Sequence, residues 1–330
     1  MKHIFILNPA AGKSGKLGEI EQRIRDVATE KGIPFEICHT DEVGDSSQFV
    51  REYCLREPEE SLRFYACGGD GTLGRVVNGA VGAANAEVAV VPIGTGNDFV
   101  RVLGKNEDFL DIAALIEAES KPFDVLRFND KYCVNMINIG FDGEVAARVS
   151  EGRGRVPSKL AYIFGVACEF FKMSKAKFHC VMDGVDMGER SVQLSLYAGG
   201  GFCGGGFHAA PYADLHDGLM DVCFVRPVSR LTLIRVIGSY RKGTYLLNED
   251  NQKYFEYYKC SDVKLTFDKP QRICVDGEIE VYESLHLSVL PDAVRIVVPG
   301  GATSPYEQIP ESPYVQTAIS SHEKIPAESK

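Results

Sequence analysis

The sequence predicts an α/β plus all-β protein, with an N-terminal Rossmann-like parallel α/β domain followed by a C-terminal antiparallel β-sandwich domain. Short apolar runs alternate with helix-like stretches over the first 120 residues, which is typical of a parallel sheet with crossover helices. From about residue 123, strand-like runs follow one another, and several alternate polar and apolar side chains. A length of 330 residues with 45% hydrophobic residues provides enough apolar side chains for two cores.

The first part of the chain consists of four strand and helix pairs. Its expected strands are HIFIL, FEICH, RFYAC and VAVVPI, and its expected helices span 17–31, 45–56, 73–81 and 109–118. In the first helix, apolar residues recur at helical spacing with charged residues between them, and Gly32 supplies a stop signal. This pattern indicates a helix that lies on one face of a sheet.

The second part consists mainly of strands. The expected strands are YCVNMINI, FHCVM, VQLSLYA, MDVCFV, VKLTF, RICV and HLSVL. Their spacing favours an antiparallel sandwich. Two amphipathic helices with basic flanks interrupt it at about 158–173 and 229–243.

These patterns set the domain boundaries. We expect the α/β domain over 1–124, with the chain returning to it near 291–303, and the β-sandwich domain over 125–290. The remaining residues, 304–330, are rich in Pro, Ser and Glu without periodicity, which predicts a disordered tail.

Composition excludes several classes of protein. A formal net charge of −10 argues against nucleic-acid binding, because phosphate contacts need a basic surface. The ten cysteines occur singly and never as CxxC, which indicates reduced residues in a cytosol. No window approaches the roughly 20 apolar residues of a membrane span, and the N-terminus lacks a signal peptide. We therefore expect a soluble, cytoplasmic protein.

Two stretches carry a local excess of positive charge. Residues 222–248 contain five basic and no acidic residues, and residues 152–177 contain six basic residues against Glu169 alone. Such stretches could give peripheral contact with the inner face of a membrane. A solvated basic helix face is the alternative.

The strongest motif is a Gly-rich turn between a strand and a helix, made of Gly68, Gly69, Asp70, Gly71 and Thr72. Glycines let backbone N–H groups approach phosphate oxygens, and a helix N-terminus adds partial positive charge. An ordinary strand-to-helix turn is the alternative, although three glycines around an Asp are rare in one. The turn matches neither the P-loop nor the dinucleotide fingerprint.

Two further loops follow strands in the same way. They consist of Asn8, Pro9, Ala10, Ala11 and Gly12 after the first strand, and of Gly94, Thr95, Gly96, Asn97 and Asp98 after the fourth. The carboxyl ends of parallel strands meet at one edge of a sheet, where ligands of open α/β sheets bind. The three loops therefore predict a nucleotide site at this edge.

Six motifs in order resemble the diacylglycerol kinase catalytic-domain family, which also contains sphingosine, ceramide and bacterial soluble lipid kinases. They are NPAAG at 8–12, GGDGTL at 68–73, PIGTGNDFVR at 92–101, GFDGEVA at 140–146, GGGFHAAPYADLHDGLMDV at 204–222 and VDGE at 275–278. The resemblance covers nearly the whole chain. It implies ATP and Mg²⁺ as cofactors and an active site in the cleft between the domains.

The resemblance also implies particular site residues. ATP would be held by Asn8 to Gly12, by Thr40 after the second strand, by Gly68 to Thr72 and by the loop with Thr95, Asn97 and Asp98. A structural magnesium would take the side chain of Asp217 and main-chain carbonyls of Asp214 and Leu219. Asp217 next to Gly218 suits a hard, oxygen-seeking cation, and a simple Asp-Gly hairpin is the alternative.

The VDGE segment is the candidate for proton transfer. The resemblance implies that Glu278 is the general base with Asp276 beside it, because phosphoryl transfer needs one carboxylate to accept the hydroxyl proton. A plain turn is the alternative. Asp70, Asp98 and Asp124 could hold a catalytic magnesium or orient this segment, or each could cap a helix.

One position departs from the family pattern. The family has Asn-Glu after GGDGTL, and this chain has Gly74 and Arg75. Arg75 could contact a phosphate bidentately or simply lie exposed on a helix.

The sequence thus favours an ATP-dependent lipid kinase that transfers the γ-phosphate to a lipid hydroxyl, with conversion of diacylglycerol to phosphatidic acid as the family's default. An NAD kinase shares the GGDGT loop and the two-domain plan, but PxGTGNDF favours the lipid kinases. A nucleotide-binding regulator without kinase activity is the third interpretation. We also expect a homodimer, through exposed strand edges.

Overall fold

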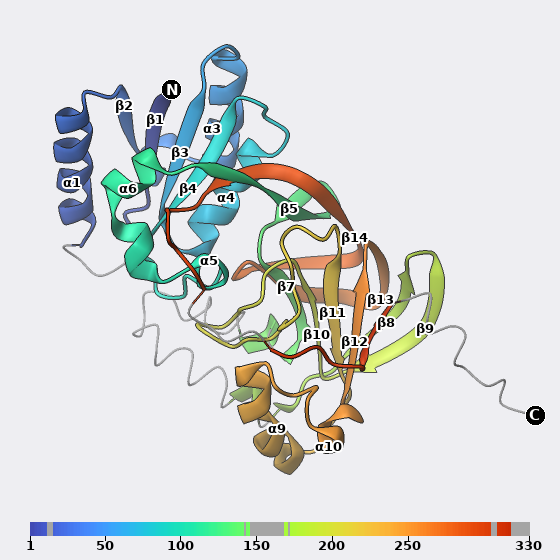
Figure 1. Ribbon diagram of the computed structural model, residues 1–330. Helices are drawn as coiled ribbons and strands as arrows, with labels where there is room; N and C mark the ends of the chain where they lie inside the picture. Colours follow the sequence, from blue (N-terminus) through green and yellow to red (C-terminus); the bar gives the residue numbers. More distant parts are fainter. Residues whose placement is uncertain (12–15, 142, 146–167, 171, 305–308, 318–330) are drawn as a thin grey trace, which may run out of the picture. The chain divides into compact units, whose positions relative to one another are not determined.

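The computed structural model describes residues 1–11, 16–141, 143–145, 168–170, 172–304 and 309–317 (Figure 1). The chain divides into two compact units. Unit 1 comprises Met1–Val125, Phe202–Gly206 and Leu290–Glu307, and unit 2 comprises Leu126–Gly201, Phe207–Val289 and Gln308–Lys330. Unit 1 is an α/β fold and unit 2 is dominated by antiparallel strands, as the sequence predicts.

The sheet of unit 1 is parallel. Its strands are β1 (Lys2–Leu7), β2 (Phe35–His39), β3 (Leu62–Gly68) and β4 (Ala86–Pro92), in the spatial order β4-β3-β1-β2. The end of β14 (Glu278–Val297) adds a parallel pairing at Ile296 and Val88. All residues of β3 and β4 are buried, because helices cover a parallel sheet.

Helices occur at three of the four positions predicted for unit 1, and the short helix over Thr40–Val43 was not predicted. The helices of this unit are α1 (Lys16–Lys31), α2 (Thr40–Val43), α3 (Ser46–Arg56), α4 (Asp70–Ala80), α5 (Val100–Leu103), the 3-10 helix η1 (Asn106–Leu110) and α6 (Ile112–Glu117). In Figure 1, α3 and α4 lie side by side. The prediction of one helix over 109–118 is wrong, because Asp111 accepts the N–H groups of Ala113 and Ala114 and starts a new helix there.

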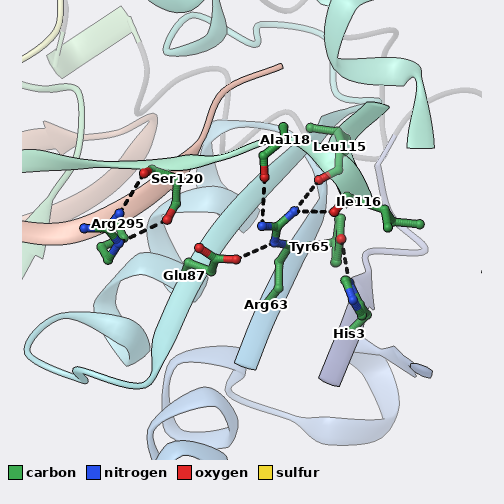
Figure 2. Close-up of polar contacts among 9 residues, drawn as sticks. All are labelled: His3, Arg63, Tyr65, Glu87, Leu115, Ile116, Ala118, Ser120 and Arg295. Carbon is green, nitrogen blue, oxygen red and sulfur yellow. Dashed lines mark hydrogen bonds and ion pairs between the residues drawn. The ribbon is translucent and has the colours of Figure 1, made fainter. Parts of the chain in front are cut away.

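A buried arginine fixes the end of α6 to the sheet (Figure 2). Arg63 in β3 is 5% exposed, and its Nε donates to Glu87 Oε1 at 2.5 Å. Its Nη atoms donate to the carbonyls of Leu115 (2.6 Å), Ile116 and Ala118 (both 2.9 Å). The last carbonyls of a helix lack intrahelical partners, so this one side chain satisfies them while Glu87 offsets its charge.

Unit 2 is built around six antiparallel strands. In spatial order they are β12 (Phe255–Cys260), β11 (Met220–Val225), β10 (Leu194–Ala198), β7 (Met136–Gly140), β13 (Asp262–Val275) and the first part of β14. Two hairpin partners, β8 (Ala176–Met182) and β9 (Val185–Val192), and the pair β5 (Ser120–Phe128) and β6 (Lys131–Cys133) join them.

The long strand β13 belongs to two pairings. Its first half, Val263 to Phe267, pairs with β8, and its second half, Ile273 to Val275, pairs with β7. The register with β14 shifts between Thr266 and Gln271, and such an irregularity bends a strand. The apolar side chains of these strands form one core cluster, which includes Phe178, Phe224 and Leu265.

Helix α9 (Arg230–Lys242) confirms the helix predicted over 229–243, and a short helix α10 (Glu249–Gln252) follows it. Of the other predicted helix, 158–173, residues 158–167 and 171 lie outside the described part of the chain, and residues 168–170 and 172 are helical.

The predicted disordered tail is wrong for one segment. Residues Val315–Thr317 form β15, which pairs in parallel with β12 at Tyr257, Tyr258 and Lys259. Ser312 is buried, and its Oγ donates to the carbonyl of Leu246 at 3.2 Å. A sequence without periodicity can still add to a strand edge, because backbone groups make that pairing. Residues 318–330 lie outside the described part.

Within the described ranges, none of the helices has the length and apolar character needed to span a bilayer.

Candidate active site

The loop after β1 is tied to the turn after β3. Asn8 Nδ2 donates to Thr72 Oγ1 at 2.9 Å, and Asn8 Oδ1 accepts the N–H of Ala10 at 2.9 Å. A Cβ on Gly68 would lie 2.1 Å from Thr72 Oγ1, so this position accepts only glycine. Thr72 is buried in the first turn of α4. The structure therefore brings together the loop with Asn8, Pro9, Ala10 and Ala11 and the GGDGT turn; Gly12 lies outside the described residues.

The turn after β3 also packs against the loop after β4. The N–H groups of Ile93 and Gly94 both donate to the carbonyl of Gly68 at 3.0 Å. A Cβ on Gly94 would lie 2.4 Å from the Cα of Gly69, so the two backbones are in direct contact. Gly69 precedes α4 as its N-cap. The glycines of both motifs thus allow a close approach of two loops.

Asp70 joins α4 to the loop after β4. Its Oδ1 accepts the N–H of Phe99 at 3.1 Å, and its Oδ2 lies close to Gly96, where a Cβ would come within 2.9 Å. Asp70 and Gly71 occupy the first turn of α4, where a carboxylate is stabilised by the helix dipole. Asp70 is therefore not the helix cap that the sequence left open.

Asn97 shapes the loop that carries Thr95. It has a positive φ of 51°, and its Nδ2 donates to the carbonyls of Pro92 (3.2 Å) and Gly94 (3.1 Å). Its Oδ1 is buried without a hydrogen-bond partner among the described residues. Thr95 is exposed in this loop.

Thr40 is the first residue of α2 and directly follows β2, the neighbour of β1 in the sheet.

Asp98 holds a distant segment of the chain in unit 1. Its Oδ2 accepts the N–H of Gly205 at 2.9 Å, and its Oδ1 accepts Arg101 Nε at 3.2 Å. Burial raises the pKa of Asp98 above its usual value, although these donors act in the opposite direction. Both carboxylate oxygens are thus engaged by the protein, which favours a structural role. Sequence reasoning missed this role of the Gly-rich residues 204–206.

Asp124 also has a structural partner. It lies inside β5, not after a strand, and is buried. Its Oδ1 accepts the N–H of Asp292 at 2.9 Å, and Arg295 donates to Ser120 in the same region (Figure 2). These bonds hold the end of β14 to unit 1.

The carboxylate of Asp276 is surrounded by donors. Its Oδ1 accepts the N–H groups of Asn135 (3.0 Å) and Met136 (3.1 Å) and Cys133 Sγ (3.1 Å), and its Oδ2 accepts the N–H of Val134 (2.8 Å). Burial raises the pKa of Asp276, and the four donors oppose that effect. Such a group fixes the connection between β6 and β7, and it is poorly placed to exchange protons.

Glu278 stands two residues further on, at the start of β14. It pairs with Val275 across the β13–β14 turn, and its side chain is half-buried. Asp276 and Gly277 make that turn with φ of 45° and 87°, the left-handed values of a tight hairpin. The Asp-Gly turn and the candidate base therefore belong to one β-hairpin, and Asp276 positions the hairpin that carries Glu278.

The predicted metal loop contains a lysine contact that the sequence did not indicate. Asp217 Oδ1 accepts the N–H of Leu219 at 3.0 Å, and its Oδ2 accepts Lys259 Nζ at 2.8 Å. Lys259 also donates to Oδ2 of the fully buried Asp221 at 3.0 Å. Burial alone would lower the pKa of Lys259, but the carboxylates of Asp221 and Asp217 raise it. Asp214 Oδ1 accepts the N–H of His216 at 3.0 Å.

This arrangement does not fit a divalent ion on Asp217. The position that a cation would take at Oδ2 is occupied by an ammonium group, and two like charges would repel at that distance. The side chain of Asp214 accepts the N–H of His216 and so shapes a backbone turn here. In this loop the charge of Asp217 is therefore balanced by Lys259.

The two residues that depart from the family pattern, Gly74 and Arg75, lie on opposite sides of α4 with respect to burial. Gly74 is buried, and its carbonyl accepts Asn78 Nδ2 at 2.8 Å, whereas Arg75 is exposed.

The fold and these loops define a class of two-unit proteins in which an open α/β sheet with three interlocked glycine-rich loops accompanies an antiparallel β unit. Residues 2–128 match the diacylglycerol kinase catalytic domain, and residues 135–298 match the YegS C-terminal NAD kinase beta sandwich-like domain. The chain belongs to the diacylglycerol kinase catalytic-domain family, and it is a kinase of the lipid kinase type. Kinases of this family use ATP.

Curated relatives match over most of their length. The chain is 28% identical over 263 residues to "Probable lipid kinase YegS-like" of Alcanivorax borkumensis, covering 79% of this chain and 85% of that protein. It is 27% identical over 309 residues to "Diacylglycerol kinase" of Bacillus subtilis, covering 87% of this chain and 95% of that protein.

Solved structures show the same fold. A diacylglycerol kinase structure from Bacillus anthracis superposes with a TM-score of 0.67 at 21% identity, covering 92% of this chain and 98% of that one. An NAD kinase from Archaeoglobus fulgidus in complex with ATP has a TM-score of 0.50 at 13% identity, covering 91% and 94%. The NAD kinase is therefore a distant neighbour in fold.

Proposed function

We propose that this protein transfers the γ-phosphate of ATP to a hydroxyl group of a membrane lipid, with diacylglycerol as the acceptor and phosphatidic acid as the product. The observation that carries this proposal is the interlocking of three loops through the residues of their own motifs. Asn8 binds Thr72, Gly69 contacts Gly94, and Asp70 binds the N–H of Phe99. The acceptor is supported by the name of the Bacillus subtilis relative.

The nucleotide site is proposed at the carboxyl ends of β1 to β4. Backbone N–H groups at the start of α4 point toward the ligand side of such a sheet and suit phosphate oxygens. The residues proposed to contact ATP are Asn8, Pro9, Ala10, Ala11, Gly12, Thr40, Gly68, Gly69, Gly71, Thr72 and Thr95. Asp70 and Asn97 are proposed to shape these loops, since their side chains bond to backbone groups within them. Asp98 is proposed to hold the segment with Gly205 beside the loop after β4.

Proton transfer is proposed for Glu278. The lipid hydroxyl must lose its proton as it attacks the γ-phosphorus, and the carboxylate of Glu278 accepts that proton. The bond between the γ-phosphorus and the β,γ-bridging oxygen breaks as the new bond forms, and ADP leaves. Asp276 keeps its four donors throughout and holds the hairpin. A magnesium ion bound to the phosphates of ATP would offset the negative charge that develops on them during the transfer.

A labelled-ATP assay tests this proposal. Purified protein is offered γ-labelled ATP with diacylglycerol, with other lipid alcohols or with NAD, and the products are separated by thin-layer chromatography. We expect label on diacylglycerol and loss of transfer in the Glu278→Gln variant. Label on NAD alone would overturn the lipid acceptor. No label on any acceptor, with ATP still bound, would make the protein a nucleotide-binding regulator.

A further inference from the structure

Helix α9 exposes apolar side chains on its outer face. Leu231 is 80% exposed, Ile234 59% and Ile237 38%, whereas Val236 and Tyr240 are buried. Only eight large hydrophobic residues are exposed in the described part of the chain, and these three lie within seven residues of one helix. Isolated exposed hydrophobic residues are common, but a cluster on one helix face marks an interaction site.

The same face carries positive charge. Arg235, Arg241 and Lys242 are exposed, and residues 222–248 contain no Asp or Glu. At about 3.6 residues per turn, Leu231, Ile234 and Lys242 lie on the side of the helix opposite Val236. We call the six residues Leu231, Ile234, Arg235, Ile237, Arg241 and Lys242 the α9 surface.

The α9 surface is part of a firmly held helix. Ser229 Oγ accepts the N–H of Thr232 at 3.2 Å at its start, and Gly243 ends it in the left-handed conformation. Inside, the ring of Tyr240 packs against Tyr245 and Phe255 at centroid distances of 5.2 and 6.2 Å. The apolar side chains are therefore displayed by a preformed helix, and no folding step opposes their burial by a partner.

We infer that the α9 surface docks on an anionic lipid membrane. Helices with leucine and isoleucine beside arginine and lysine lie in the membrane interface, with the apolar groups among the acyl chains and the cations at the headgroups. The choice of a lipid partner rests on the proposed function, because a lipid kinase must reach an acceptor that stays in the bilayer.

Charge argues against a second copy of the chain as the partner. Two α9 surfaces face to face would bring two sets of Arg235, Arg241 and Lys242 together, and no carboxylate occurs between residues 222 and 248 to compensate them. A lipid surface with negative headgroups removes this repulsion. Each cation close to such a surface strengthens binding by about fivefold.

Vesicle sedimentation tests the inference with full-length protein. The probes are vesicles of phosphatidylcholine alone and vesicles with added phosphatidylglycerol. We expect wild-type protein to bind the mixed vesicles more tightly, and added salt to weaken that binding. The Leu231→Ser/Ile234→Ser variant should lose about tenfold or more on both vesicles. The Arg235→Gln/Arg241→Gln variant should lose only its preference for phosphatidylglycerol.

A matched control is Leu55→Ser, because Leu55 is 75% exposed on α3, in unit 1. It should bind vesicles as wild type does, and all variants should keep the wild-type unfolding temperature. Equal binding by wild type and the Leu231→Ser/Ile234→Ser variant would overturn the inference. A homodimer in light scattering that this variant breaks, without any vesicle binding, would assign the surface to self-association instead.

The Glu278→Gln variant separates this inference from the proposed function. It should bind vesicles like wild type although it lacks phosphoryl transfer. If the wild-type protein binds vesicles but has no kinase activity, the membrane role of the α9 surface is supported and the proposed function is refuted. If it phosphorylates dispersed lipid but does not bind vesicles, the proposed function is supported and the membrane role of the α9 surface is refuted.

Discussion

Lys259 Nζ lies 2.8 Å from Asp217 Oδ2, so a lysine ammonium neutralises the side chain that the family resemblance assigns to a structural magnesium. The contact follows from strand pairing, because Lys259 in β12 stands opposite Asp221 in β11 and binds it at 3.0 Å. The lysine therefore fixes the loop before β11 to the sheet. A metal ion bound to Asp217 would stabilise the loop in the same way.

Removing this lysine should make the loop depend on a metal ion. In Lys259→Met, the buried carboxylate of Asp221 loses its partner, which should cost about 3 kcal/mol of unfolding free energy. Millimolar Mg²⁺ should then raise the unfolding temperature of the variant but leave that of wild type unchanged, in the absence of nucleotide. The matched control is Lys264→Met, an exposed residue of β13. A wild-type unfolding temperature that rises with Mg²⁺, and does so less in Asp217→Asn, would contradict the role of Lys259.

Gly94→Ala should damage nucleotide binding. The new Cβ would lie 2.4 Å from the Cα of Gly69 and 2.8 Å from Asn97 Oδ1, so the two loops must separate. We expect ATP affinity, measured by calorimetry, to fall at least about tenfold, because separation changes the backbone that faces the phosphates. Gly18→Ala in α1 is the control, since no atom lies within 4 Å of a Cβ there. It should bind ATP normally and be more stable by about 0.5–1 kcal/mol. Unchanged ATP affinity in Gly94→Ala would separate the loop contact from nucleotide binding.

Asp276 and Glu278 should respond differently to amide substitution. In Asp276→Asn, an amide NH₂ group replaces one carboxylate oxygen, so either the N–H of Val134 or the N–H groups of Asn135 and Met136 lose their acceptor. This loss should lower the free energy of unfolding by about 2 kcal/mol. Glu278→Gln should keep the stability and lose phosphoryl transfer. Urea unfolding and the labelled-ATP assay measure the two effects on the same preparations. Equal losses of stability in both variants would mean that Glu278 is also structural.

Acid should destabilise unit 1 through His3. Burial lowers the pKa of His3 to about 4, and its Nδ1 lies 2.8 Å from the hydroxyl of Tyr65 (Figure 2). The unfolded chain therefore binds a proton that the folded chain does not between about pH 6.5 and pH 4, and stability falls as the pH decreases through that window.

The comparison variant is His3→Gln, which can still bond to Tyr65. Between pH 7 and pH 4, it should lose about 2–3 kcal/mol less unfolding free energy than wild type. Identical pH dependence in wild type and His3→Gln would show that His3 does not titrate as its burial implies.

Much of the fold could be predicted because its signals are local. The apolar runs of β1, β3 and β4, the helical spacing in α1 and the glycines after β3 are each contained in a few neighbouring residues. Together they indicate a parallel sheet with loops at one edge. The error at α6 was also local, since Asp111 divides a continuous apolar stretch by capping a new helix.

Other features could not be predicted because they join residues that are far apart in the chain. Asp98 holds Gly205, Arg63 closes the end of α6, and Val315–Thr317 pair with β12. Strand order and register decide such contacts, and neither leaves a periodic signal in the sequence.

The sequence by itself determined the α/β unit, the β-rich unit and the three glycine-rich loops, because periodicity and turn chemistry depend on neighbouring residues. Only the tertiary structure decided that Lys259 neutralises Asp217, 42 positions away, and that Asp276 holds the connection between β6 and β7. The physical reason is that a charged side chain has one role when solvated and another when folding removes water and brings a partner within hydrogen-bonding distance.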